Sequence, residues 1–97
     1  MANRVEQIGK EVERRQRLGR AIAAARTVRG WTSGEFAARC GFDGSFMSLV
    51  ENGLRQLSSE SFDVVAKTLG MPVDVLEGFA SKRVDSERLG RWFKQAV

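Results

Sequence analysis

Four glycines divide the middle of this 97-residue chain into short apolar segments. Gly30, Gly41, Gly53 and Gly70 each follow residues whose apolar positions recur at helical spacing. Glycine often ends a helix because it adopts the left-handed conformation at little cost. No strand pattern occurs anywhere in the sequence, and the chain is long enough to bury a modest core. We therefore predict an all-α bundle of short helices.

Capping residues and apolar positions predict where these helices begin and end. Thr32 and Glu35 form a capping box that opens a helix over residues 33–40, and Asp43 can cap the next helix. We expect further helices over residues 44–52, from Ser58 or Ser59 to Leu69, from Met71-Pro72 onward, and within residues 85–97. The expected core residues are Leu18, Ile22, Ala25, Phe36, Cys40, Phe42, Met47, Val50, Phe62, Val65, Ala66, Leu69, Val73, Leu76 and Phe79.

The N-terminal segment carries a narrow apolar stripe. Val5, Ile8 and Val12 recur three or four residues apart among charged residues, which predicts an amphipathic helix over residues 4–16. The pattern leaves open whether this helix is separate from the next one or continuous with it. It also leaves open whether the stripe pairs with a second copy or packs locally, since it is too short for a coiled coil that is stable alone.

The composition excludes several kinds of function. The chain has no His and no Tyr, and Cys40 is its single cysteine, so we expect no metal site, no cofactor and no histidine-based catalysis. Its carboxylates are not gathered around a nucleophile or glycine-rich motif, and we expect neither enzyme activity nor a small-molecule ligand. The lack of a long apolar run and the single cysteine favour a cytoplasmic protein that does not enter membranes.

Positive charge lies at the two ends of the sequence. Residues 1–30 hold eight basic and three acidic residues, whereas residues 31–80 hold three basic and seven acidic ones. Residues 81–97 hold five basic and two acidic residues. The net charge of +4 favours a polyanionic partner, and attraction to phosphate would depend heavily on the flanks.

A series of motifs runs in register from Leu18 to Phe79, in the order LGRAIAAAR, EFAARCGF, MSLVENG and FDVVAKTLGMPVDVLEGF. This series resembles the Cro/repressor-type (Xre-type) helix-turn-helix family, in which five helices form the domain and the second and third bind DNA. We therefore divide the chain into a basic helical extension over residues 1–17, a DNA-binding domain over residues 18–80, and an extra helix within residues 81–97.

The resemblance implies a set of DNA contacts. Ser33 would contact phosphate at the start of the second helix, and the loop after the third helix would contact the DNA backbone. The exposed residues of the third helix would read bases, although none offers the paired hydrogen bonds of Arg to guanine or Gln to adenine. The implied DNA-binding residues are Ser33, Asp43, Gly44, Ser45, Ser48, Leu49, Asn52, Arg55 and Gln56, with phosphate contacts from Arg14, Arg15, Arg17 and Arg20 in the flank.

Two interactions within and between chains also follow from the resemblance and the apolar pattern. Arg26, late in the first helix, would form a partly buried ion pair with Glu51 of the Glu-Asn-Gly motif. Leu89, Trp92 and Phe93 present more apolar surface than one short helix hides, so they either contribute to a homodimer or fold back onto their own domain.

Two functions remain open. In the first, the protein is a repressor that binds double-stranded operator DNA selectively as a homodimer. In the second, the scaffold binds mainly a protein partner, as an antitoxin-like regulator does, and contacts DNA weakly; the acidic middle of the chain favours this alternative. We prefer the first function because the series of motifs is complete.

Overall fold

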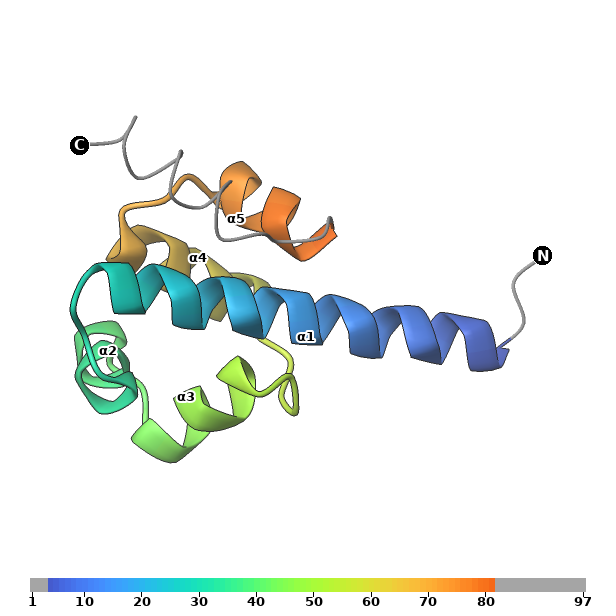
Figure 1. Cartoon of the computed structure of the whole chain (residues 1–97), viewed down its shortest axis with the longest axis horizontal. Helices are drawn as coiled ribbons and strands as arrows, with labels where there is room; N and C mark the ends of the chain where they lie inside the picture. Colours follow the sequence, from blue (N-terminus) through green and yellow to red (C-terminus); the bar gives the residue numbers. More distant parts are fainter. Residues whose placement is uncertain (1–3, 82–97) are drawn as a thin grey trace.

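The computed structural model describes residues 4–81, which form five α-helices and no strand (Figure 1). The all-α class expected from the sequence is therefore confirmed for this part of the chain. The helices are α1 (Arg4–Val28), α2 (Ser33–Cys40), α3 (Gly44–Glu51), α4 (Ser59–Leu69) and α5 (Val73–Ser81). The helix expected within residues 85–97 lies outside the described residues.

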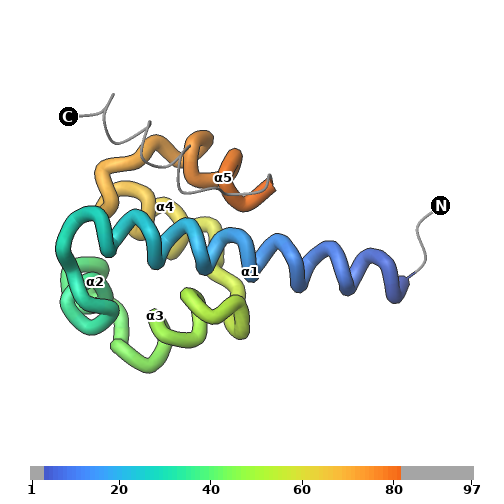
Figure 2. Tube along the Cα trace, viewed as in Figure 1, coloured from blue at the N-terminus to red at the C-terminus, as the bar shows by residue number. Residues whose placement is uncertain are grey.

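The N-terminal segment is continuous with the helix that follows it. α1 runs without a break for 25 residues, which settles the question that the sequence pattern left open. Its C-terminal half lies between α3 on one side and α5 on the other, and its N-terminal half projects beyond the other four helices (Figures 1 and 2). The domain is therefore a compact bundle with one long helical arm.

The capping box predicted for α2 is confirmed. The Thr32 hydroxyl accepts from the Glu35 N–H at 3.1 Å, and the Glu35 carboxylate accepts from the Thr32 N–H at 3.3 Å. Ser58 caps α4 through its hydroxyl. Asp43 is the N-cap residue of α3, as expected, but its side chain makes no capping hydrogen bond. The Asp43 carboxylate instead accepts from the hydroxyl of Ser45, in the first turn of α3, at 3.0 Å.

The helices pack around a core that largely matches the predicted one. The expected core residues that are buried are Leu18, Ile22, Ala25, Phe36, Met47, Val50, Val65, Ala66, Leu69 and Leu76, while Cys40, Phe42, Phe62 and Phe79 are half-buried and pack against them. The expectation that Val73 belongs to the core was wrong, because this residue is 45% exposed. Leu76 and Ala80, one turn apart, form the buried face of α5, and Val73 instead lines an open groove beside α4.

The α1 and α3 backbones lie close together at Gly19, a residue whose role no sequence pattern indicates. A Cβ atom at Gly19 would overlap the carbonyl oxygen of Glu51 and lie 2.6 Å from that of Val50. Because both neighbours are backbone atoms, no side-chain rotation could make room for it. The glycine therefore sets the distance between the long helix and the end of α3.

Replacing Gly19 with Ala should push α3 away from α1. We expect the free energy of unfolding to fall by about 3 kcal/mol, the upper part of the range for overpacked sites. Urea denaturation followed by circular dichroism measures this loss.

Gly34→Ala is the matched control, because nothing lies within 4 Å of the position that its added Cβ would take in α2. It should leave stability unchanged or raise it by up to about 1 kcal/mol. Equal losses in the two variants would contradict the close approach at Gly19.

Candidate nucleic-acid interface

Residues 41–43 join α2 to α3 through a sharp turn. Gly41 adopts the left-handed conformation at φ 74°, where a side chain would be strained. The N–H groups of Gly41 and Phe42 donate to the carbonyls of Ala38 and Ala37 at 3.1 and 2.8 Å, which satisfies the end of α2. The Phe42 ring then packs edge-on against Phe46 of α3, with ring centroids 5.4 Å apart. Hydrogen bonds and ring packing together fix the direction in which α3 leaves the turn.

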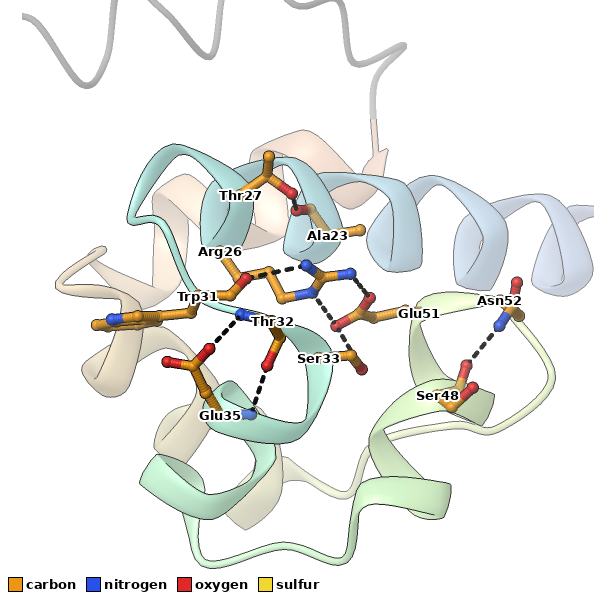
Figure 3. A network of polar contacts seen from close by, with 10 residues as sticks. All are labelled: Ala23, Arg26, Thr27, Trp31, Thr32, Ser33, Glu35, Ser48, Glu51 and Asn52. Atoms are coloured by element: carbon orange, nitrogen blue, oxygen red, sulfur yellow. Dashed lines mark hydrogen bonds and ion pairs between the residues drawn. The ribbon is translucent and has the colours of Figure 1, made fainter.

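The ion pair expected between Arg26 and Glu51 ties α1 to the end of α3 (Figure 3). Two parallel hydrogen bonds join the guanidinium to the carboxylate, from Nε at 2.7 Å and from Nη2 at 2.8 Å. A third guanidinium nitrogen donates to the Trp31 carbonyl at 3.1 Å. The Glu51 side chain is only 8% exposed and that of Arg26 20%, so water screens the pair weakly. The bond to Glu51 raises the pKa of Arg26 above its ordinary value, and the arginine remains charged.

The residues expected to read bases lie on an exposed face of α3. Ser45, Ser48 and Leu49 follow one another at helical spacing, so they share one side of the helix, and Asn52, which was expected to contact the DNA backbone, continues that side at the C-cap. All four are exposed, as are Asp43 and Gly44 at the start of α3. The other side of α3 buries Met47 and Val50 in the core. The bundle thus presents the small side chains of α3 outward.

Some polar groups on this face are already engaged within the helix. The Asn52 amide donates to the Ser48 carbonyl at 2.8 Å, which satisfies the C-terminal end of α3 (Figure 3). The Ser45 hydroxyl donates to Asp43, as described above. The Ser48 hydroxyl and the Leu49 side chain are the groups of this face that are not engaged within α3, and both are exposed. They are the best placed of these residues to contact a partner.

Three further predicted contacts lie at the ends of α2 and α3. Arg55 is exposed, and its guanidinium lies 5.8 Å from the centroid of the Phe46 ring, which keeps a cation beside α3. Gln56, the next residue, is also exposed. Ser33 is half-buried, and its hydroxyl donates to Glu51 at 3.5 Å. Its contribution to anion binding therefore depends mainly on its backbone N–H in the first turn of α2.

Two of the four flanking arginines are bound to α5 and lie away from α3. Arg14 binds Glu77 of α5, and Arg17 donates to the Ala80 carbonyl at 2.9 Å. α3 and α5 lie on opposite sides of α1, so these two cations are directed away from α3 (Figure 1). Arg20 is exposed and Arg15 is half-buried. Charge counting could not anticipate this division, because the partners of Arg14 and Arg17 lie 63 residues away in sequence.

Other kinds of site find little support within residues 4–81. No group of three His, Cys, Asp or Glu side chains in this range could hold a metal ion. No helix in it combines the length and the apolar character needed to cross a bilayer. Cys40 is half-buried, and desolvation raises the pKa of its thiol, which lowers its reactivity. Leu89, Trp92 and Phe93, expected to contribute to dimerisation, lie outside the described residues.

No protein-family model matches the chain, and a search of curated proteins finds none similar to it.

Removing the carboxylate of Glu51 should destabilise the domain strongly. Glu51→Ala leaves the Arg26 guanidinium partly buried without its partner, and we expect the free energy of unfolding to fall by about 3 kcal/mol. Glu77→Ala is the control: the side chains of its pair with Arg14 are 46% and 40% exposed, and we expect a loss below about 1 kcal/mol. Chemical denaturation compares the two, and a Glu51→Ala variant as stable as wild type would refute a structural role for the buried pair.

Proposed function

We propose that this chain is a transcriptional regulator of the Cro/repressor-type helix-turn-helix kind. It binds double-stranded operator DNA selectively as a homodimer and acts as a repressor. The observation that carries the proposal is the exposed face of α3, held in place by the turn at residues 41–43 and by the buried Arg26–Glu51 pair. A helix fixed at both ends with one free face is the geometry that major-groove reading requires.

In this proposal, small side chains of α3 read the major groove. The Ser48 hydroxyl donates to or accepts from a base edge, and Leu49 contacts a thymine methyl group. Asp43 and Ser45 act as a bonded unit, in which the Ser45 hydroxyl donates its proton to Asp43 and keeps both lone pairs for a donor on a base, while the carboxylate accepts from cytosine N4. None of these contacts is bidentate, so part of the selectivity comes from the shape and deformability of the operator.

Phosphate contacts position α3 on the duplex. Arg55, whose guanidinium lies beside α3, and the backbone N–H groups at the start of α2 are the groups of the α2–α3 unit that suit contacts to phosphate. Arg15 and Arg20 form no ion pair or hydrogen bond among the described residues, whereas α5 holds Arg14 and Arg17. We therefore assign the flank's phosphate contacts to Arg15 and Arg20.

The alternative partner is a protein, and one observation favours it. α3 has neither Lys nor Arg, and residues 33–56 hold two basic and three acidic residues. Leu49 is 40% exposed in the middle of the free face. A surface that is apolar and slightly acidic attracts phosphate poorly, so the same face could bind a protein instead.

Fluorescence anisotropy distinguishes the two functions. The full chain is titrated against labelled genomic DNA fragments, and the fragments that it binds are titrated again between about 50 and 200 mM salt. The proposal predicts that a few fragments bind at least about a thousandfold more tightly than the average fragment. Weak binding without selection that disappears with salt would favour the protein partner.

Arg55→Ala should weaken binding to all fragments alike. Loss of one phosphate contact lowers the slope of log K against log salt concentration by about 1. Lys67→Ala, in α4, removes the same charge from an exposed position outside α2 and α3 and should leave the slope unchanged. Equal changes in the two variants would mean that only the net charge matters, which contradicts a contact at Arg55.

A further inference from the structure

The projecting half of α1 carries an apolar stripe that is open to solvent in the described part of the chain. Val5 is 77% exposed and Ile8 52%, while Val12 is half-buried. This half of the helix extends beyond the other four helices (Figure 2). A helical segment of about ten residues is marginally stable in water unless its apolar face is covered. Covering the stripe with a partner surface would therefore stabilise this half of α1.

The stripe prolongs the face that α1 already uses for packing. At 3.6 residues per turn, Val5, Ile8 and Val12 lie within about 60° of one another around the helix axis, centred on the direction of Gly19. Gly19 and Arg26 both contact α3. The same side of α1 thus packs on α3 in its C-terminal half and is open in its N-terminal half.

We propose that this stripe binds the same stripe of a second copy, with the two helices antiparallel about a two-fold axis. Charge complementarity supports this occupant. Arg4 and Glu11 lie on the same flank of the stripe, about two turns apart. Antiparallel packing brings equal flanks together, so Arg4 of each copy lies opposite Glu11 of the other. A parallel pair would set this flank against Gly9 and Gln16, where no ion pair forms.

The register set by these two ion pairs also interdigitates the apolar side chains. With Arg4 opposite Glu11, the two-fold axis passes between Gln7 and Ile8. Val5, Ile8 and Val12 of one copy then alternate with those of the other along the helix axis, about 3 Å apart, except that the two Ile8 residues lie closer together at the centre. Glu6 lies opposite Gly9, so the described carboxylates do not face one another across the contact.

This register also bears on DNA binding, a step that rests on the proposed function. Gly19 marks the contact of α1 with α3, and in the paired helices the two Gly19 positions lie about 35 Å apart along the helix axis at 1.5 Å per residue. Two recognition helices on successive major grooves need a separation of about 34 Å. The antiparallel arm thus supplies the spacing that a repressor dimer requires.

Sedimentation equilibrium of the full chain without DNA tests the pairing. Three apolar residues from each copy make a small interface, so we expect a dissociation constant on the order of micromolar. Arg4→Glu and Glu11→Arg should each raise it at least about tenfold, and the double variant should restore it, because the exchanged charges pair again. Lys10→Glu makes the same charge change as Arg4→Glu on the opposite face of α1 and should not affect the constant.

Disulfide trapping tests the register. In a Cys40→Ser background, Ile8→Cys places two thiols beside the two-fold axis, and mild oxidation should give a covalent dimer. Lys10→Cys in the same background should run as a monomer after the same oxidation, on a gel without reducing agent.

A monomer at all concentrations would overturn the inference. So would a dimer that Arg4→Glu and Glu11→Arg leave unchanged, since residues such as Leu89, Trp92 and Phe93 would then hold it together, or a double variant that fails to recover. The assays contain no DNA, so a monomeric chain that selects DNA contradicts this inference alone. A chain that dimerises but selects no DNA contradicts the proposed function alone.

Discussion

The bundle depends on one close contact, between the middle of α1 and the end of α3. Gly19 allows the α3 backbone to approach α1, and about two turns further along the helix Arg26 binds the Glu51 carboxylate through two hydrogen bonds. The glycine sets the distance between α1 and α3, and the ion pair sets the angle between these two helices. Because Glu51 also accepts from Ser33, the same carboxylate links the start of α2 to both helices. The position of the candidate interface therefore depends on a buried charge pair. Removing either partner would leave an uncompensated buried charge and lower the free energy of unfolding.

α1 organises the rest of the domain through both of its sides. On the side opposite α3, Arg14 and Arg17 bind α5, and near its end Arg29 donates to the Leu69 carbonyl at the end of α4 at 2.7 Å. Arg17 and Arg29 satisfy carbonyls at the C-terminal ends of α5 and α4, where cations are favoured. Much of the positive charge in the first thirty residues is thus structural. This is why the basic N-terminal segment is a weaker indication of DNA binding than its charge implies.

Much of the fold follows from the sequence because its signals are local. Thr32 and Glu35 mark a helix start three residues apart, Gly41 and Gly70 mark helix ends, and apolar periodicity identified most of the core. Errors arose where the outcome depends on tertiary contacts. Val73 fits the apolar pattern of α5, yet the way α5 packs on α1 buries Leu76 and Ala80 instead. Neither the steric role of Gly19 nor the α5 partner of Arg17 has a sequence signal, since each depends on residues more than thirty positions away.

For the site, the sequence identified an α3 face that is indeed exposed. It could not separate the flanking arginines that bind α5 from those that stay available.

The central claim is that the exposed face of α3 reads DNA. The most direct measurement is an NMR titration of the full chain with a DNA fragment that it selects. The proposal predicts that the largest amide shifts fall in α3, at Ser45, Ser48 and Leu49, with smaller ones at Ser33 and Arg55. Binding that leaves the α3 amides unshifted, or shifts confined to the arginines of α1, would contradict it.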